Sequence, residues 1–462
     1  MKASSAALGG LRKLIGGTGL GARLARGGIT ALAIRMSSVG FSYLMFVVIA
    51  RHMSKDGFGQ FGFAFSFATF VAVIAVLGQP ILVLRFIPAY QHEGRTSLLD
   101  GLIRDSRIAV LSGSLICALA TISGSLIWKQ FTGVDSWYLI WAALLMVAMA
   151  VSRHQAYMMR AFGNIALAMA PRDVIWRVVV IVCILFLARD QTTVSASYGI
   201  NICSLTLLVI FLVQAISDPA TRPFKAVRAK RESDRGLWSR ESLGIWPVTI
   251  VQAAGPNVSV VVLGLSLSPE ATGPFFAALK TAMLLTLPLA AGAIVGAPLI
   301  SQYYGAGQLD QVQKVSRYLV IGITAPVFIG LLIVLLFGDR ILGFFGPDFT
   351  SAKLSMTLIA IGALVNALSG PTGFIMNMTG HHRQFLAIMA VTQAVSLTIQ
   401  PIAAWYFGMV GAAAAVALGM ISWNVWVWRW SRRNLSIDPT FYAIVEWLIG
   451  RKGRAESSNE TT

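Results

Sequence analysis

Residues 319–337 read LVIGITAPVFIGLLIVLLF, an uncharged stretch bracketed by Arg317 and Arg340. A helix rises about 1.5 Å per residue, so about 20 such residues cross the hydrocarbon core of a bilayer. This stretch therefore predicts a membrane-spanning helix. Working outward from it, the chain contains twelve apolar segments of comparable length. The twelve expected helices are 28–50, 60–84, 106–128, 137–158, 165–188, 193–216, 243–267, 272–300, 315–337, 353–378, 383–406 and 408–429.

The composition points to the same class of protein. The hydrophobic fraction is 56%, the charged fraction is 12% and the mean hydropathy is +0.72. A soluble domain carries about 25% charged residues, so we expect an all-α, polytopic membrane protein. The three cysteines, Cys117, Cys183 and Cys203, all lie in apolar segments, and the sequence has no CxxC motif or Cys/His cluster. We therefore expect no disulfide framework, no metal and no cofactor.

Lysine and arginine are concentrated in every second gap between the apolar segments. A net charge of +18 is also found in nucleic-acid-binding proteins, but cations that flank spanning segments follow the positive-inside rule. We therefore expect no nucleic-acid partner and place both termini in the cytoplasm. The cations on that side include Arg85, Arg95, Arg104, Arg107, Lys314, Arg317, Arg383, Arg429, Arg432 and Arg433. Trp128, Trp137 and Trp141 are expected at the outer interface, and Trp423, Trp426, Trp428 and Trp430 at the inner one.

The charges and apolar segments divide the chain into five parts. No h-region with a cleavage site follows residues 1–27, so we expect no cleaved signal peptide. Their Ser/Arg content resembles a mitochondrial transit peptide, but we expect a basic cytoplasmic arm, because the first span follows directly. Residues 28–216 and 243–430 are two six-helix bundles, joined by a basic cytoplasmic linker at 217–242. Residues 431–462 are expected to form a cytoplasmic tail, in which Phe441, Ile444, Val445 and Leu448 predict a short interfacial helix; the alternative is a frayed polar end.

An internal echo suggests that the two bundles are repeats. Ser54-Lys-Asp-Gly-Phe-Gly-Gln-Phe-Gly-Phe-Ala and Ser268-Pro-Glu-Ala-Thr-Gly-Pro-Phe-Phe-Ala-Ala match at five positions with a constant offset. The matching pairs are Ser54 and Ser268, Asp56 and Glu270, Gly59 and Gly273, Phe61 and Phe275, and Ala64 and Ala278. Because each bundle has an even number of helices, both would enter the membrane in the same orientation, as in parallel-repeat transporters.

Several stretches near the start of the chain resemble a known family. They are helix one with its interior Arg35, the loop Ala50-Arg-His-Met-Ser-Lys-Asp-Gly-Phe-Gly-Gln-Phe-Gly, and Leu84-Arg-Phe-Ile-Pro-Ala-Tyr. These resemble bacterial polysaccharide-biosynthesis membrane proteins, the lipid-linked oligosaccharide flippases (Wzx-like) of the multidrug/oligosaccharidyl-lipid/polysaccharide (MOP) superfamily. The resemblance implies two MATE-like six-helix bundles around a central cavity that works by alternating access. It also implies a bacterial inner-membrane location, with a polysaccharide polymerase and a chain-length regulator as partners.

Four cations lie inside the expected spans: Arg35, Arg172, Arg177 and Lys280. A charge at the centre of a spanning helix costs about 2.5–3.5 kcal/mol on insertion scales, so such a residue is a candidate functional residue. Together the four predict a cavity that binds an anionic substrate. For Arg35 the alternative is snorkelling to the inner interface along its own helix. For Lys280 it is an ion pair with Asp173.

Helix five contains Pro171-Arg-Asp-Val-Ile-Trp-Arg, in which Asp173 and Arg177 are four residues apart. That spacing predicts an ion pair on one helix face, and Pro171 predicts a kink. Arg172 would then point elsewhere. Two roles remain open for Asp173: it neutralises Arg177, or it titrates as a coupling residue.

Other polar groups are secondary candidates. Arg153, Tyr157 and Arg160 share a face of helix four, where they form either a basic mouth for an anionic headgroup or ordinary flanking charges. Gly255-Pro256-Asn257 and Ser369-Gly-Pro-Thr-Gly are expected to interrupt two spans. The amides of Gln252, Asn257, Asn366, Asn377, Gln393 and Gln400 could bind sugar hydroxyls or join helices to one another.

The expected function is therefore a flippase that moves an undecaprenyl-pyrophosphate-linked oligosaccharide to the outer leaflet for surface polysaccharide or O-antigen synthesis. One alternative is a cation-coupled multidrug or other small-molecule exporter of the same superfamily, although an interior rich in cations disfavours cationic drugs. The other is a membrane-embedded polymerase or ligase. Such an enzyme needs catalytic groups on a substantial loop, and the short expected outer loops contain no His/Asp/Glu cluster. We do not expect an enzyme.

Overall fold

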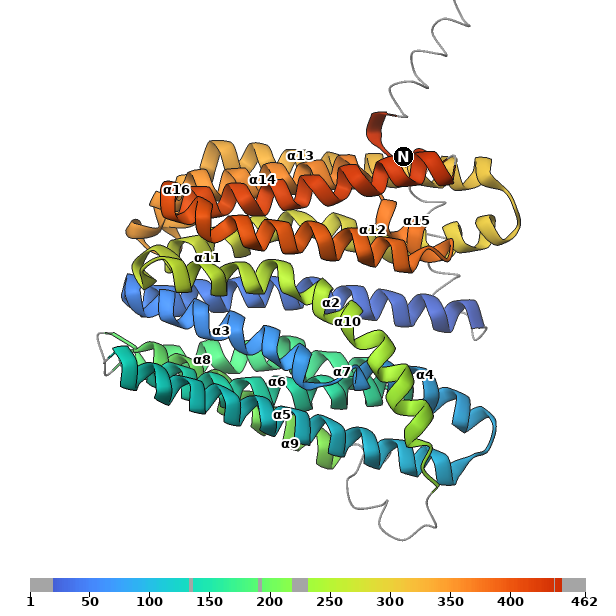
Figure 1. Cartoon of the computed structure of the whole chain (residues 1–462), viewed down its shortest axis with the longest axis horizontal. Helices are drawn as coiled ribbons and strands as arrows, with labels where there is room; N and C mark the ends of the chain where they lie inside the picture. Colours follow the sequence, from blue (N-terminus) through green and yellow to red (C-terminus); the bar gives the residue numbers. More distant parts are fainter. Residues whose placement is uncertain (1–19, 133–135, 190–192, 218–231, 436, 443–462) are drawn as a thin grey trace, which may run out of the picture. The chain divides into compact units, whose positions relative to one another are not determined.

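The computed structural model describes residues 20–132, 136–189, 193–217, 232–435 and 437–442, and every regular element in these ranges is a helix (Figure 1). The elements are α2 (Leu20–Arg51), α3 (Lys55–Ala75), α4 (Gln79–His92), α5 (Thr96–Thr132), α6 (Trp137–Ala161), α7 (Ile165–Ala170), the π-helix η1 (Pro171–Ile175), α8 (Trp176–Leu187), α9 (Ala196–Ser217), α10 (Arg235–Ser266), α11 (Pro269–Met283), the 3-10 helix η3 (Leu284–Thr286), α12 (Leu287–Gly305), α13 (Leu309–Gly343), the 3-10 helix η4 (Pro347–Ala352), α14 (Lys353–Leu368), α15 (Thr372–Met378) and α16 (His382–Asn434).

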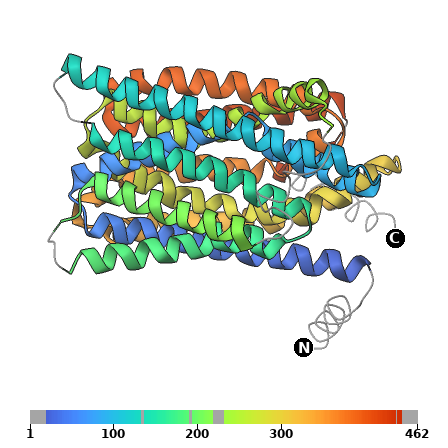
Figure 2. The same ribbon diagram turned by 90° about the horizontal axis from the view of Figure 1, so that it is seen from below.

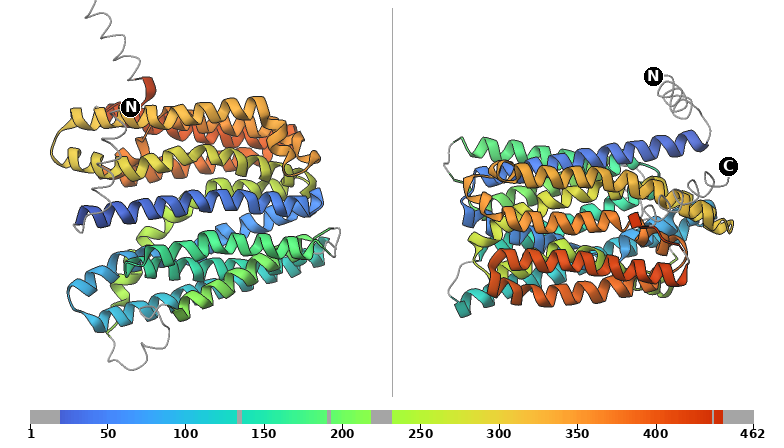
Figure 3. Two further views of the ribbon diagram at one scale, coloured as in Figure 1. Left: turned by 180° about the vertical axis from the view of Figure 1, so that it is seen from behind. Right: turned by 90° about the horizontal axis from the view of Figure 1, so that it is seen from above.

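The chain divides into two compact units, and each is described by itself. Unit 1 takes its described residues from 1–54 and 64–250, and unit 2 from 55–63 and 251–462. Helices α3 and α10 therefore contribute residues to both units. In unit 1, α6 packs against α4, α5 and α9, while α2 packs against α7, η1 and α8 (Figure 2). In unit 2, α14 packs against α11, α13 and α16, and α12 packs against α13 (Figure 3).

The twelve expected spans each correspond to one helix or to consecutive helices. Ten helices in the described part of the chain are long and apolar enough to cross a membrane. One of them, α16, contains two expected spans, because the backbone leaves helical geometry at Gly408 (φ 59°, ψ −147°). Beyond that point the chain runs back, and the Ser396 hydroxyl donates to the Ala415 carbonyl at 2.8 Å. The fifth expected span is divided into α7, η1 and α8, each too short to be counted alone.

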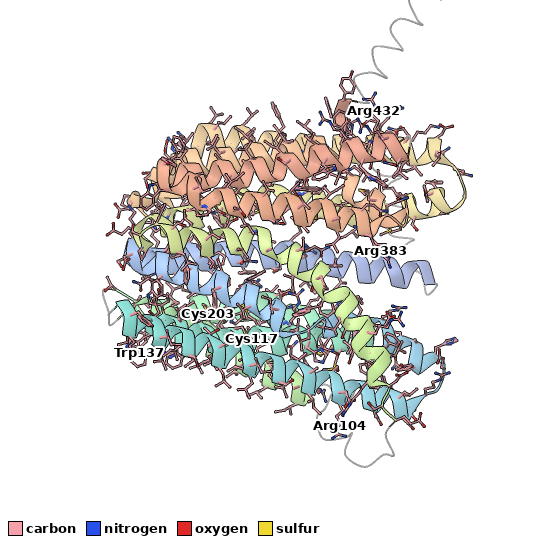
Figure 4. All side chains as sticks on the ribbon, in the orientation of Figure 1. Arg104, Cys117, Trp137, Cys203, Arg383 and Arg432 are labelled. Carbon is pink, nitrogen blue, oxygen red and sulfur yellow. The ribbon has the colours of Figure 1, made fainter. Side chains whose placement is uncertain are left out.

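Side-chain exposure agrees with membrane insertion. Large apolar side chains are exposed along α5, α9 and α13, for example Leu115, Val209 and Leu336 at 60%, 58% and 73%. A soluble monomer rarely exposes so extended an apolar surface. In unit 1, Trp137 and Arg104 lie at opposite ends of the helices, with Cys117 and Cys203 between them (Figure 4). This matches the expected placement of the aromatic residue and the cation at opposite interfaces.

The second expected span, 60–84, is wrong at its end. Helix α3 stops at Ala75, and Leu77 and Gly78 take positive φ angles of 50° and 73°. The chain turns there into α4, whose Leu82 and Val83 are fully buried beside Leu102 and Trp238. By their composition these apolar residues were expected to belong to the second span. In the structure they form the buried face of a separate helix, α4.

Other boundaries also differ from those expected. Helix α10 begins at Arg235, inside the expected linker 217–242, and runs unbroken through Gly255-Pro256-Asn257, so the predicted interruption there is wrong. The second predicted interruption is confirmed, because α14 ends at Leu368 and Gly370 has a φ of 71° before α15. Helix α16 extends to Asn434, into the expected tail. The expected interfacial helix falls largely on residues 443–462, outside the described residues.

The glycines matched by the internal echo meet in unit 2. A Cβ added at Gly59 of α3 would overlap the Pro269 carbonyl and approach the Gly273 nitrogen to 3.1 Å. A Cβ added at Gly273 of α11 would lie 2.8 Å from the Lys55 carbonyl and 3.2 Å from the Gly59 nitrogen. The first turns of these two helices thus cross backbone to backbone at equivalent positions, as two repeats related by a local axis would.

Candidate functional site

The site in unit 1 is built on the π-helical turn η1. Pro171 opens this turn, and its ring nitrogen has no hydrogen to donate. A π-turn holds one extra residue per turn, and such turns are frequent at functional sites. It contains Arg172 and Asp173, and Arg177 follows in the first turn of α8. The sequence thus places three of its interior charges on a locally irregular stretch of a spanning segment.

Arg177 is held by main-chain and aromatic contacts. Its Nη1 donates to the backbone carbonyl of Asp173, and its guanidinium carbon lies 5.5 Å from the centre of the Trp176 ring. Its Nε is buried and has no hydrogen-bond partner among the residues that the structure describes. A buried donor without a partner is costly, so this group is suited to an incoming acceptor.

The expected ion pair between Asp173 and Arg177 is not formed at close range. Among the described residues no nitrogen–oxygen contact within 4 Å joins the two side chains, although the Asp173 carboxylate acts electrostatically on both Arg177 and Arg172. The extra residue of the π-turn rotates position 173 away from the face it would share with position 177 in a regular α-helix. Whether Asp173 titrates in the working cycle remains a prediction.

Arg172 joins the cations of α6. Arg153, Tyr157 and Arg160 all lie within its electrostatic range. The Tyr157 ring lies between two guanidinium groups, with the Arg160 carbon 4.9 Å and the Arg153 carbon 6.0 Å from its centre. All four side chains are half-buried. The structure thus gathers residues that the sequence treated as separate features, and we call Arg153, Tyr157, Arg160 and Arg172 the arginine cluster.

Arg35 lies on α2, a helix that packs close to the arginine cluster, but its own side chain is not shown to contact the cluster. Helix α2 packs against η1 and α8, but the Arg35 side chain is exposed. Within the described residues it makes no hydrogen bond or ion pair. An exposed cation in an apolar helix needs either a water-filled surrounding or a path to the interface. Both roles expected for Arg35 therefore stay open.

Lys280 is the interior cation of unit 2. It lies in the last turn of α11, is half-buried, and its Nζ is 5.0 Å from the centre of the Phe276 ring. A cation–π contact compensates part of the cost of removing the ammonium group from water. Among the described residues of unit 2, no carboxylate forms an ion pair with it; the alternative of an ion pair with Asp173 stays a prediction.

Unit 2 also contains a mostly apolar cavity of about 170 Å³ between α10 and α16, with a few polar side chains in its wall. Its polar lining residues are Gln252, Ser259, Thr392, Gln393 and Ser396. Pro256 lies in its wall and cannot donate a backbone hydrogen bond to the carbonyl of Gln252, four residues earlier. The cavity thus presents amides, hydroxyls and a main-chain acceptor, the groups that bind sugar hydroxyls.

The other amide candidates divide between the two expected roles. Gln400 joins helices, because its Nε2 donates to the Ser259 carbonyl at 2.8 Å. Asn257 donates from Nδ2 to Ala253 of its own helix at 3.0 Å and does not line the cavity. Asn366 is buried, and its Oδ1 has no hydrogen-bond partner in the described part of the chain. Gln252 and Gln393 are therefore better placed for a ligand than Asn257.

Sequence reasoning missed His154. It is only 3% exposed, and its Nε2 lies 3.2 Å from the Ser106 hydroxyl, between α6 and α5. The signal was present, because an imidazole in an apolar span is as unusual as an arginine. Arg153 directly precedes His154, and two neighbouring basic residues near a helix end resemble ordinary flanking charges.

Solved structures show which class of protein this fold defines. An inward-facing multidrug resistance MATE family transporter of the MOP superfamily matches 88% of this chain and 98% of its own, with a TM-score of 0.68 and 14% identity. A MOP superfamily transporter from Pyrococcus furiosus, described as having a binding pocket of reversed polarity that suggests a different function, matches 90% and 96%, with a TM-score of 0.62 and 13% identity. A mutant of the Vibrio cholerae MATE transporter VcmN matches 90% and 96%, with a TM-score of 0.59 and 17% identity. The chain is thus a multi-pass membrane protein with the fold of MOP-superfamily transporters.

Family profiles take the assignment one step further. The polysaccharide biosynthesis protein family matches residues 24–304, more than half of the chain, and the MatE family matches residues 248–405. No curated relative matches the sequence significantly. The chain belongs to the polysaccharide biosynthesis protein family, and the expected resemblance is confirmed at that level.

Proposed function

We propose that this protein flips a pyrophosphate-linked oligosaccharide on a polyprenyl carrier from the inner to the outer leaflet of a bacterial inner membrane. The observation that carries the proposal is the arginine cluster, with Arg177 beside it, inside the spanning region of a polysaccharide biosynthesis family member. Guanidinium groups bind phosphate oxygens through two parallel hydrogen bonds. Arg172, Arg177, Arg153 and Arg160 would bind the pyrophosphate in unit 1.

The remaining parts of the carrier suit other features of the chain. The cavity lined by Gln252 and Gln393 would bind sugar hydroxyls in unit 2, and Lys280 would be the interior cation of that unit. Arg35 would meet the anion if its surroundings are water-filled. The polyprenyl tail would remain in the bilayer. A polymerase and a chain-length regulator would take the oligosaccharide on the outer side.

Charge also supplies a direction for transport. With both termini in the cytoplasm, an inside-negative potential favours outward movement of an anion by about 2.3 kcal/mol per charge for each 100 mV. This contribution applies only to charge that is not accompanied by a counter-ion. A multidrug exporter built on this chain would have to bind organic cations among arginines, which like-charge repulsion opposes.

The test is complementation of surface polysaccharide in a strain that lacks the protein. A buried charge-assisted hydrogen bond contributes about 2 kcal/mol, so Arg177→Ala should reduce surface polysaccharide roughly tenfold or more at unchanged protein level. Arg177→Lys should restore only part of it, since a point charge replaces a planar fork. Lys280→Ala should also reduce export.

The matched control is Arg383→Ala, which removes an exposed cation at the start of α16. It should export as the parent protein does. Full activity of both Arg177→Ala and Lys280→Ala would show that these cations do not form an anion site, and the proposed function would lose its support.

A further inference from the structure

A second hollow in unit 2 has no role in the proposed transport. It has a volume of about 680 Å³ and lies against the last turns of α16. The described residues of its wall form two rows in which successive residues are four apart, one from Ile421 to Arg433 and the other from Ser422 to Asn434. Residues four apart share a helix face, so the hollow follows one face of α16. None of these residues lines the cavity that contains Gln252.

The wall changes from apolar to cationic along its length. Ile421 and Val425 are at one end, within an expected span, and Arg429 and Arg433 are at the other. The cationic end is the one that the charge distribution assigns to the cytoplasmic side of the membrane. An apolar wall that leads to two cations at this level is complementary to an amphiphile whose anionic head lies in the inner leaflet.

The two arginines of the hollow are available to a ligand. Arg429 and Arg433 are exposed, and neither makes a hydrogen bond, an ion pair or a ring contact with another described residue. Arg432, in the same turn, lies on another face, 3.9 Å from the carboxylate of Asp438. That carboxylate also accepts a hydrogen bond from Trp428 Nε1 at 3.2 Å. The neighbouring acid thus compensates Arg432 and not the arginines of the hollow.

Two indole rings lie between the apolar and cationic ends. Trp430 is half-buried, and its ring centre lies 4.9 Å from that of His381, so this part of the wall is held in place. Trp426, one turn earlier, is 46% exposed. Indole rings suit the membrane interface, because they combine a large apolar surface with one polar N–H group. They can pack beside the glycerol backbone of a phospholipid.

The end of the helix is partly prepared for an anion. The last carbonyl groups of a helix carry partial negative charge, which opposes an anion. Asn434 Nδ2 donates to one of them, the Trp430 carbonyl, at 2.8 Å. This contact satisfies one acceptor, and the guanidinium groups of Arg429 and Arg433 supply positive charge on the same face.

We propose that this hollow binds one anionic phospholipid of the inner leaflet, of the phosphatidylglycerol type. Its phosphate lies between Arg429 and Arg433, since guanidinium groups bind phosphate oxygens through paired hydrogen bonds. Its glycerol backbone packs beside Trp426, and an acyl chain lies along Val425. A phosphatidylethanolamine head carries an ammonium group, which the two arginines repel. The inference depends on membrane insertion and not on the proposed cargo.

The experiment is native mass spectrometry of the full-length protein in detergent, titrated with phosphatidylglycerol or phosphatidylethanolamine. Wild type should retain one phosphatidylglycerol at concentrations at which phosphatidylethanolamine is lost. Arg429→Gln and Arg433→Gln should each weaken phosphatidylglycerol binding about fivefold, the loss expected for one interfacial cation. Trp426→Ala should weaken it without changing a charge.

The matched control is Arg432→Gln, which removes an exposed cation from the same turn but from the face beside Asp438. It should bind phosphatidylglycerol as wild type does. Equal losses from Arg429→Gln, Arg432→Gln and Arg433→Gln would indicate a diffuse basic surface and would overturn the proposal. So would a wild-type protein that does not distinguish the two lipids.

Further arms identify the source of the phosphate. Inorganic phosphate should not displace the lipid, because it has no apolar part to pack against the indole rings. Polyprenyl phosphate should compete more weakly than phosphatidylglycerol, and tighter binding of polyprenyl phosphate would assign the hollow to the cargo and refute a phospholipid site. Arg177→Ala should bind phosphatidylglycerol as wild type does, so the lipid site and the proposed function are tested separately.

Discussion

The surroundings of Asp173 show how one backbone irregularity changes the chemistry of a side chain. In a regular helix Asp173 and Arg177 would form a neutral pair. In the π-turn that follows Pro171, Arg177 donates instead to the Asp173 carbonyl. The carboxylate then compensates both Arg172 and Arg177 over a longer distance. Its compensating charge is thus shared between Arg172 in η1 and Arg177 in α8.

This arrangement predicts the effect of removing the carboxylate. Asp173→Asn should lower thermal stability in detergent, because it leaves the half-buried Arg172 and Arg177 with less compensation. Breaking a close buried pair costs about 3–5 kcal/mol, and this longer-range interaction should cost less. Adding Arg177→Gln to Asp173→Asn should recover part of the loss. The control Arg177→Gln alone separates the two charges.

A different result would change the interpretation of Asp173. If Asp173→Asn were as stable as the parent and had lost only its response to a proton gradient, the residue would be a proton carrier. Restoration of transport by Arg177→Gln would then not be expected.

At the scale of elements, the crossing of α3 and α11 depends on the absence of two side chains. Gly59 and Gly273 let the backbones touch, and Phe58 packs edge-on against Phe276 at 5.6 Å beside them. Small residues at a crossing allow the close packing that holds helices together in lipid. The crossing fixes residues 55–63 within unit 2, although the rest of α3 belongs to unit 1.

Alanine at either glycine should therefore destabilise the protein. Gly59→Ala or Gly273→Ala introduces a Cβ that must displace main-chain atoms, and overpacking of this kind costs about 1–3 kcal/mol. The measurement is the midpoint of thermal unfolding in detergent. Gly124→Ala is the matched control, because a Cβ there meets nothing within 4 Å and alanine favours a helix by about 0.5–1 kcal/mol. Equal midpoints for all three variants would argue against a tight crossing.

At the scale of the whole molecule, the distribution of charge predicts sidedness. Arg240 lies in the region expected in the cytoplasm and is exposed, while Asp348 is exposed in η4 on the expected outer side. After replacement of the native cysteines, Arg240→Cys should react with an impermeant thiol reagent only from inside. Asp348→Cys should react only from outside. Labelling of both from one side would contradict the twelve-span arrangement.

What could be derived from the sequence follows from local, additive quantities. The free energy of inserting a segment depends on its length and apolar content, and orientation depends on the cations beside it. Residues 319–337 therefore predict a span without reference to any other helix. The interior cations Arg172, Arg177 and Lys280 can be recognised for the same reason, since each is a charged residue inside an apolar segment. The polytopic class, the expected spans and the candidate charges needed nothing more.

Packing between distant helices decided the rest. The apolar run Ile81-Leu82-Val83 continues a span by composition, and only burial against Leu102 and Trp238 assigns it to α4. Arg153 and Arg160 become neighbours of Arg172 through the contact of α6 with α7. His154 meets its partner Ser106 only because α6 packs against α5. The sequence by itself determined which residues are costly in a membrane, because that cost is a property of each segment. The tertiary structure alone decided which of them act together, because that depends on the helix faces that pack.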